Sequence, residues 1–256
     1  MQLSALAERL DDRLDTDAYA DVDASPNGLQ IGPEEASIER VAFAVDAAAA
    51  TIENAAAVDA DALVVHHGLV WGGLDRVTGR DYENISALVE KDLALYVSHL
   101  PLDGHQELGN AAGVADHLGL DGDSREPFGA LGPVTIGQRG RTADPYSVSE
   151  LREKLASLDT GGRDPRVLDF GPEEIEEVAI VTGSGVDWLG EAAEAGADAL
   201  VTGEGKQQVY HEAREAEMNV FLAGHYATET FGVEALADLV SEWGVETTVL
   251  SHPTGL

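Results

Sequence analysis

The feature of this sequence that most constrains its fold is an internal repeat. The segment ADALV fills residues 60–64 and recurs, 137 residues later, at residues 197–201. The same spacing carries the apolar pair Val41-Ala42 onto the pair Val178-Ala179. So short a segment can recur by chance, but matched spacing on both sides of it favours a duplication. We therefore expect two similar halves whose related faces meet at a cleft.

Short apolar runs alternate with helical patterns in both halves. Strands are predicted at residues 41–45, 62–65, 93–98, 133–137, 167–170, 178–181, 199–202, 220–223 and 246–250. Helices are predicted between them, after an amphipathic helix over residues 3–14 and including one that a Ser147/Glu150 capping box begins. Strands that alternate with helices are typical of α/β layers with helices on the faces of a sheet. The predicted fold class is therefore α/β, with two similar α/β lobes.

Polar segments suggest where the lobes divide. Residues 121–127 are polar and acidic and are interpreted as the boundary between the lobes. The first lobe is then expected to contain residues 1–125 and about 226–256, and the second residues 126–225. Residues 23–33, which are rich in Pro, Gly and Asn, are predicted to form a loop.

The composition limits the location of the chain and the kind of metal site it can build. No apolar run approaches the roughly 18–20 residues that a membrane span needs, and the acidic N-terminal segment lacks the apolar core of a signal peptide. We therefore expect a cytoplasmic protein with no membrane partner. The chain has no cysteine, so any metal site must use His, Asp, Glu and water. Such ligands suit Zn, Fe, Mn, Ni or Mg.

The chain is strongly acidic, with 48 acidic and 15 basic residues and a formal net charge of −33. The acids are spread along the whole chain, which favours adaptation to high intracellular salt, a halophilic protein, over a single acidic interaction surface. Nucleic acid is an unlikely partner, because no basic stripe is present to neutralise phosphates. That argument loses force at molar salt.

Three predicted strands end in residues of the kind that bind metal ions. His66 and His67 follow the first ADALV strand directly. The other two strand ends carry the pattern His-x3-acid, as His99 with Asp103 and as His225 with Glu229. Ligands collect at the carboxyl ends of strands in open α/β sheets. Adjacent histidines that leave a strand point in divergent directions, so they suit two neighbouring metal ions better than one.

Each of these residues also has a structural interpretation. A histidine at a strand end is commonly a hydrogen-bonded structural residue, and the acids of the His-x3-acid pairs can be carboxylates favoured by a helix N-terminus. This number of ligand-type residues at three strand ends is hard to reconcile with coincidence. We therefore predict a dinuclear metal site in the cleft between the lobes. By contrast, His105 is expected near the rim of the site, and three others are read as surface or structural residues: His117, His211 and His252.

Four motifs together resemble the Nif3-like family of dinuclear-metal proteins, whose members are named homologues of GTP cyclohydrolase 1 type 2. The motifs are VVHHGLVWGG, YVSHLPLDGHQELGNAAGVADHLGL, ADALVTGEGKQQVYHEAR and AGHYATET. The resemblance covers nearly the whole chain and implies the short form of the family, without an inserted domain. It also implies a homohexamer and two divalent metal ions per chain. It does not say whether these ions are Zn, Fe, Mn or Ni. The implied metal ligands are His66, His67, Asp103, His225 and Glu229.

Residues near these ligands are candidates for other roles. His99 is interpreted as a catalytic neighbour that orients Asp103 or binds substrate. Glu204 lies at the repeat position of His67 and is a candidate base, or else an acid at a helix start. Asn27 and Gln30 are expected to border the cleft. We interpret Trp71 as a core residue, with stacking against a planar substrate as the alternative.

Three functions remain open at this point. The first is a metal-dependent hydrolase that acts on a nucleotide-like small molecule, with Glu204 and His99 as its catalytic residues. The second is a metal-binding or regulatory scaffold without turnover. The third is a phosphodiesterase or nuclease that uses the same two metal ions. Nothing in the residues selects guanine, and the chain has neither a P-loop nor a GxGxxG motif after a strand.

Overall fold

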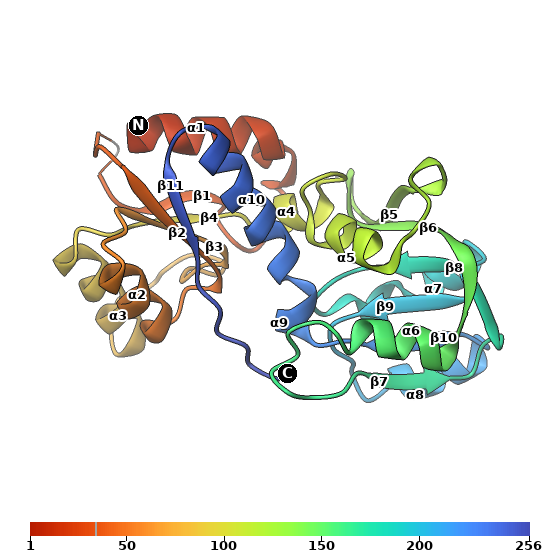
Figure 1. The fold of residues 1–256 in the computed structure, drawn as a ribbon. Helices are drawn as coiled ribbons and strands as arrows, with labels where there is room; N and C mark the ends of the chain where they lie inside the picture. Colours follow the sequence, from red (N-terminus) through yellow and green to blue (C-terminus); the bar gives the residue numbers. More distant parts are fainter. Residues whose placement is uncertain (34) are drawn as a thin grey trace. The chain divides into compact units, whose positions relative to one another are not determined.

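The computed structural model describes residues 1–33 and 35–256, and the chain folds as two compact units (Figure 1). Unit 1 contains Met1–Leu102 and Gly232–His252, and unit 2 contains Asp103–Phe231 and Pro253–Leu256. Each unit is built around its own mixed sheet with helices packed against it. The predicted α/β fold class is confirmed.

The sheet of unit 1 has five strands, in the order β1-β4-β3-β2-β11. Neighbouring strands are parallel except β1, which is antiparallel to β4. In chain order the strands are β1 (Gly28–Ile31), β2 (Arg40–Asp46), β3 (Ala62–His67), β4 (Ala94–Val97) and β11 (Glu246–Val249). The helices are α1 (Leu3–Leu14), η1 (Thr16–Tyr19), α2 (Ala49–Ala57), α3 (Arg80–Glu90) and α10 (Thr230–Glu242).

The sheet of unit 2 has six strands, in the order β5-β6-β8-β9-β10-β7. The strands are β5 (Glu126–Leu131), β6 (Val134–Ser147), β7 (Arg166–Asp169), β8 (Glu174–Ile180), β9 (Ala199–Thr202) and β10 (Asn219–Leu222). The helices are α5 (Asn110–Leu118), η2 (Gly122–Ser124), α6 (Val148–Leu155), η3 (Gly185–Trp188), α7 (Leu189–Glu194), α8 (Val209–Glu215) and α9 (His225–Thr228). One further helix, α4 (Leu100–Gly104), carries the chain from unit 1 into unit 2. In the described part of the chain, no helix is both long and apolar enough to cross a membrane.

The two sheets share a core of four strands. The order β1-β4-β3-β2 in unit 1 corresponds to β7-β10-β9-β8 in unit 2, with three parallel strands flanked by an antiparallel one in each case. The pairing of Val41 with Ala62 recurs as the pairing of Val178 with Ala199. This is the register that the 137-residue repeat predicts.

A side-chain to backbone contact repeats with the same offset. The carboxylate of Asp61 accepts hydrogen bonds from the backbone N–H groups of residues 39 and 40 at 2.7 and 2.9 Å. Asp198, 137 residues further on, accepts them from residues 176 and 177, both at 2.9 Å. The aspartate of ADALV therefore links the beginning of its own strand to the neighbouring strand in both halves.

Apolar side chains on alternate strand positions explain how each sheet holds its helices. In unit 1, Leu63 and Val65 of β3 pack with Ile52 of α2 and Leu88 of α3, and all four are fully or almost fully buried. Burying such a side chain contributes roughly 1.5–3 kcal/mol. A similar cluster in unit 2 packs α5 and α6 on β8, β9 and β10. The predicted capping box is confirmed at the start of α6, where Ser147 and Glu150 bond reciprocally.

The two units divide the chain differently from the predicted lobes. Residues 103–125, 226–231 and 253–256, which the sequence assigns to the first lobe, belong to unit 2. The reason lies in α5, because its residues Val114 and Leu118 pack with Val178 and Val201 of the second sheet.

The sequence patterns do not predict β1, β5 or the second half of β6. β1 lies within the predicted loop 23–33, and β5 overlaps the predicted boundary 121–127. Both strands are at sheet edges, where Gly and Pro are tolerated because one side of the backbone needs no partner. Edge strands therefore lack the continuous apolar runs that identify the central strands.

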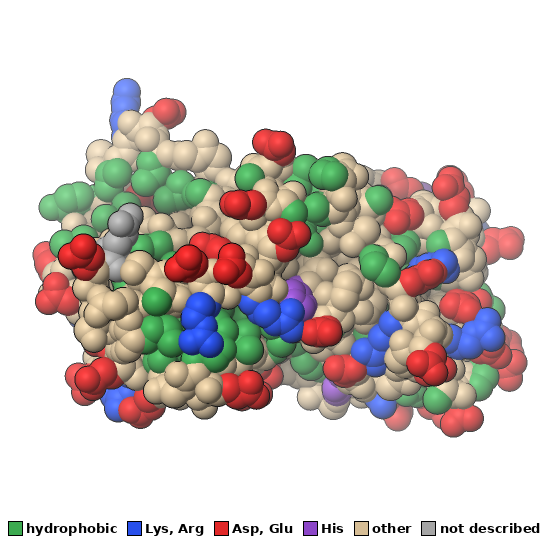
Figure 2. All heavy atoms as spheres, turned by 90° about the horizontal axis from the view of Figure 1, so that it is seen from above, with side chains coloured by type: hydrophobic (Ala, Val, Ile, Leu, Met, Phe, Trp, Pro, Cys, Tyr) green, Lys and Arg blue, Asp and Glu red, His purple; other side chains and the backbone are tan. Residues whose placement is uncertain are grey.

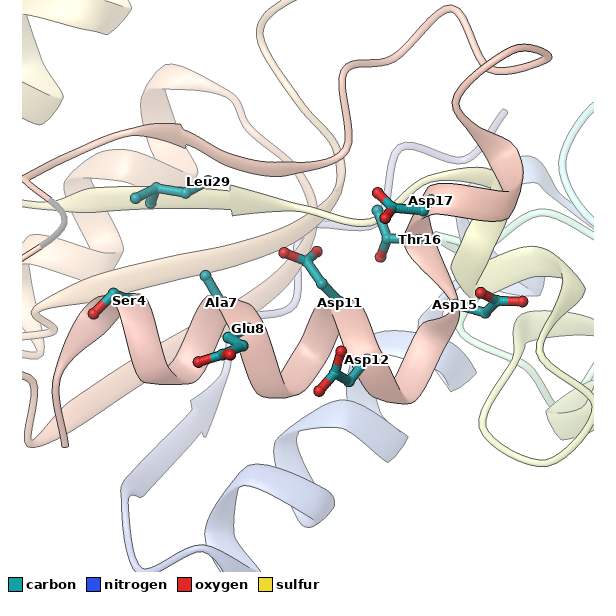
Figure 3. Close-up of a pocket in the computed structure, with 9 residues that line it drawn as sticks. All are labelled: Ser4, Ala7, Glu8, Asp11, Asp12, Asp15, Thr16, Asp17 and Leu29. Atoms are coloured by element: carbon teal, nitrogen blue, oxygen red, sulfur yellow. The ribbon is translucent and has the colours of Figure 1, made fainter.

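Acidic side chains are distributed over both units. Figure 2 shows Asp and Glu side chains scattered over the whole visible face. Beside α1, a hollow of about 460 Å³ is lined by several carboxylates (Figure 3). These are Glu8, Asp11, Asp12, Asp15 and Asp17. Carboxylates this close repel one another, so the region is sensitive to screening by salt.

Candidate metal centre

Three histidines form a cluster at the carboxyl ends of two neighbouring strands in unit 1. His66 and His67 end β3, and His99 follows β4. Their ring centroids lie 4.6 Å (His66 and His67), 5.1 Å (His66 and His99) and 5.6 Å (His67 and His99) apart. One donor nitrogen from each ring lies within 4.8 Å of the other two. We call these residues the histidine cluster.

The rings of the histidine cluster are oriented in the same way. The Nδ1 atom of His66 lies 3.0 Å from the carbonyl oxygen of Ser98, and that of His67 lies 2.9 Å from Oδ1 of Asp46. The Nδ1 atom of His99 lies 2.8 Å from Oδ1 of Asp23. Because all three partners are acceptors, Nδ1 must carry the proton in each ring, and in the neutral ring Nε2 holds the lone pair. Metal-binding histidines are oriented by such partners.

Asp23 fastens His99 to the loop before β1. Its carboxylate is almost fully buried and also accepts hydrogen bonds from the backbone N–H of Leu100 at 3.0 Å and from the Asn27 side chain at 2.8 Å. Burial raises the pKa of Asp23. The hydrogen bond and charge of His99, with the hydrogen bonds from Asn27 and Ser25, lower that pKa by more, so the net shift is downward. The predicted border residue Asn27 also accepts the backbone N–H of His99, at 2.7 Å.

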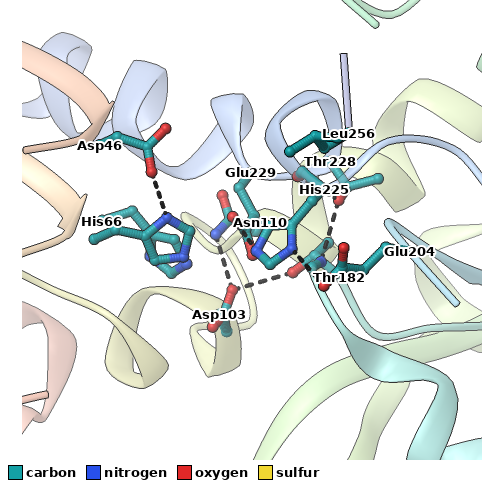
Figure 4. A network of polar contacts seen from close by, with 12 residues as sticks. Asp46, His66, Asp103, Asn110, Thr182, Glu204, His225, Thr228, Glu229 and Leu256 are labelled. Atoms are coloured by element: carbon teal, nitrogen blue, oxygen red, sulfur yellow. Dashed lines mark hydrogen bonds and ion pairs between the residues drawn. The ribbon is translucent and has the colours of Figure 1, made fainter. Parts of the chain in front are cut away.

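A second cluster of donors lies in unit 2. The Nε2 atom of His225 lies 3.2 Å from Oε2 of Glu229, within the turn formed by α9. Carboxylate oxygens of Glu229 and Asp103 lie within 4.8 Å of one another. Both carboxylates are buried, at 3% and 7% relative exposure. We call Asp103, His225 and Glu229 the carboxylate cluster (Figure 4).

Two glutamates act on the ring of His225. Its Nδ1 atom lies 3.2 Å from Oε1 of Glu204, opposite the contact with Glu229. Burial lowers the pKa of His225, but the hydrogen bonds and charges of Glu229 and Glu204 outweigh it and raise that pKa to about 9. Glu204 therefore lies beside the cluster, as its repeat position suggests, and its contact orients His225.

Neighbouring polar groups hold Asp103 in place. Its Oδ1 atom accepts hydrogen bonds from the Asn110 side chain at 2.9 Å and from the Thr182 hydroxyl at 3.1 Å (Figure 4). Asn110 begins α5, and Thr182 follows β8. The carboxylate is thus fixed by two elements of unit 2, which sets the direction of its remaining lone pairs.

Gly183 makes room for Glu229. It lies at the repeat position of Asp46, has φ of +59°, and a Cβ atom there would lie 2.2 Å from Oε1 of Glu229. In unit 1 the corresponding residue, Asp46, has a side chain that contacts His67. In unit 2 the glycine has no side chain, and the carboxylate of Glu229 lies in the space beside it.

Gly203 allows a second close approach. It lies at the repeat position of His66, and a Cβ atom there would lie 2.6 Å from the Cα atom of His225. The two halves thus have corresponding strands but carry their metal-type residues at different positions. In the second half, glycines at the positions of Asp46 and His66 leave room for α9 and its side chains.

The remaining predicted neighbours have varied surroundings. His105 accepts the backbone N–H groups of Glu107 and Leu108 through Nδ1, which is a structural role in a turn. Gln30 packs against Gly68, directly after the histidine cluster. The interpretation of Trp71 as a core residue is wrong, because 47% of its surface is exposed.

Several residues of the site are not predicted from the sequence. Asp46 directly follows the predicted strand 41–45 and could have been found by the strand-end argument, and Gly183 could have been found by its repeat position. Asp23 lies in an irregular loop, and no sequence pattern ties it to a histidine 76 residues away.

The fold and these two clusters define an α/β protein of two units that carries His, Asp and Glu ligands suited to divalent metal ions. The chain belongs to the Duf34/NIF3 (NGG1p interacting factor 3) family, whose model matches residues 1–254. The predicted family is thereby confirmed.

Known relatives match the chain over its length. A Halobacterium salinarum protein named GTP cyclohydrolase 1 type 2 homolog is 59% identical to this chain, and the alignment covers 100% of both chains. The solved structure of protein ybgI, described as of unknown function, is 32% identical with a TM-score of 0.91, and that of TTHA1606 from Thermus thermophilus is 36% identical with a TM-score of 0.89. Both structural matches cover 100% of each chain, as expected for the short form without an inserted domain.

Proposed function

We propose that His66 and His67 of the histidine cluster bind two divalent metal ions together with the carboxylate cluster, and that the protein is a metal-dependent hydrolase of a nucleotide-like compound. The observation that carries the proposal is the orientation of the His66 and His67 rings, each of which has its Nδ1 atom on an oxygen acceptor. Chain connectivity adds support. Asp103 follows His99 by four residues across the single turn of α4, so their Cα atoms are at most about 14 Å apart.

The proposed ligands are His66, His67, Asp103, His225 and Glu229. Bound metal ions would supply a Lewis acid at the reacting group and lower the pKa of water. His99, held through Nδ1 by Asp23, would present Nε2 to move a proton to or from the substrate. Glu204 would hold His225 through Nδ1, and its role as a base stays a prediction. The homohexamer and the cytoplasmic location expected from the sequence also stay predictions.

We expect metal-loaded protein in molar KCl to hydrolyse at least one member of a panel that includes GTP, other nucleotides and a short single-stranded oligonucleotide. Replacing His99 with Gln should lower the turnover by about 10²–10⁴-fold while the metal content is unchanged, because the ring would move a proton without binding the metal. Product chromatography and elemental analysis measure the two effects. His117→Gln is the matched control, because the His117 ring contacts the Lys154 carbonyl and the Ser157 hydroxyl, and neither residue is a proposed ligand.

Each outcome separates the candidate functions. The hydrolase is supported if the protein turns over a nucleotide, and if a chelator abolishes that turnover and His99→Gln reduces it. Retained metal with no turnover of any compound favours a metal-binding scaffold, and cleavage of the oligonucleotide alone favours a phosphodiesterase. An unchanged GTP sample would exclude GTP as the substrate.

A further inference from the structure

An exposed tryptophan stands beside the histidine cluster. Trp71 follows His67 by four residues and is 47% exposed, whereas Trp188 and Trp243 are partly buried. The ring centroid of Trp71 lies 5.0 Å from that of His99, with the planes at 83°, and 6.0 Å from that of His67. The indole therefore meets these rings at an angle and is not stacked on either of them.

The segment that carries Trp71 is held by the loop that positions His99. The backbone N–H of Gly72 donates a hydrogen bond of 2.7 Å to the carbonyl oxygen of Ala24, the residue after Asp23. Gly72 and Gly73 have φ of +66° and +107°, and no heavy atom lies within 4 Å of a Cβ built on either. The turn after Trp71 thus has open space around it, and its backbone is hydrogen-bonded to the loop that contains Asp23.

We propose that Trp71 is a specificity-determining residue that stacks against a planar heteroaromatic ring of the ligand. The proposal rests on the proposed function, since it assigns the ring-binding part of the same site. An exposed indole face gains most from a flat π-system in an offset stack, and stacking of a base on an aromatic side chain depends little on which base it is. A sugar phosphate has no such face. Trp71 therefore selects for the ring of a nucleotide-like compound and leaves the choice of base open.

The test measures binding, not turnover. In the Trp188→Phe/Trp243→Phe protein, Trp71 is the only tryptophan left and reports on its own surroundings. The metal-loaded protein is titrated with guanosine 5′-monophosphate, and with ribose 5-phosphate as the ring-free control. Equilibrium dialysis then compares Trp71→Leu and Trp71→Phe, each in the otherwise unchanged sequence. Tyr82→Leu is the matched control, because Tyr82 is another exposed aromatic residue of unit 1.

We expect the nucleotide to quench Trp71 fluorescence, and Trp71→Leu to weaken nucleotide binding about tenfold or more. Trp71→Phe and Tyr82→Leu should bind nearly as the unchanged protein does, and ribose 5-phosphate should bind all variants equally. Three results overturn the proposal: no quenching by the nucleotide, equal nucleotide affinity in Trp71→Leu, or parallel loss of both ligands. A change in oligomeric mass of Trp71→Leu at unchanged nucleotide affinity would assign the residue to a contact between copies instead. Metal content is measured on the same samples, so failure of the metal site is seen separately.

Discussion

Replacing Gly183 with alanine is expected to weaken metal binding by about 10–100-fold, the range found when residues that support metal ligands are changed. A Cβ atom at this position would lie 2.2 Å from Oε1 of Glu229 and 3.1 Å from Nε2 of His225. The first contact is too short and the second is tight, so the carboxylate must move away from its place in the carboxylate cluster. Competition with a chelator measures the change in affinity.

The control for this variant is Gly196→Ala. Gly196 also has positive φ, +79°, but no heavy atom lies within 4 Å of its Cβ position. Both variants lose roughly 1–2 kcal/mol of folding free energy for an L-residue in the left-handed region, which urea denaturation of the metal-free proteins measures. Only Gly183→Ala should lose affinity for metal. Equal metal affinity in the two variants would show that Glu229 does not bind the ion.

Raising the salt concentration is expected to stabilise the protein strongly. The Debye length falls from about 10 Å at about 0.1 M salt to about 3 Å at about 1 M, which screens the repulsion within a chain of net charge −33. If several kcal/mol of repulsion are relieved, the melting temperature should rise by about 10 °C or more between about 0.1 M and about 2 M KCl.

The acidic hollow beside α1 supplies a matched variant. Asp12 is exposed and lies among the carboxylates that line the hollow (Figure 3). Asp12→Asn should therefore be more stable than the unchanged protein at low salt, and the difference should vanish at about 2 M KCl. A melting temperature that does not depend on KCl would contradict the salt interpretation and favour an acidic interaction surface.

The central strands and their terminal ligands could be predicted from the sequence for a physical reason. A strand buried on both faces needs a continuous apolar run, as in the ALVV of β3, and the first polar residues after such a run mark the strand end. His66, His67, His99 and His225 were identified in this way, and the structure places them at the end of β3 or within three residues after the ends of β4 and β10.

Features that depend on long-range packing could not be predicted. β1 and β5 are recognisable only once β4 and β6 are present to pair with them. The assignment of residues 103–125 to unit 2 depends on the apolar face of α5 meeting β8 and β9. Asp23 is buried because a residue 76 positions away bonds it, and no local pattern encodes such a contact.

The metal content of protein purified without a nickel column tests the central claim most directly. Elemental analysis should find about two divalent metal ions per chain in the unchanged protein. The His67→Ala/Glu229→Ala variant, which removes one proposed ligand from each cluster, should retain almost none. One ion or none in the unchanged protein, or full retention in the folded variant, would contradict a dinuclear centre built from these residues.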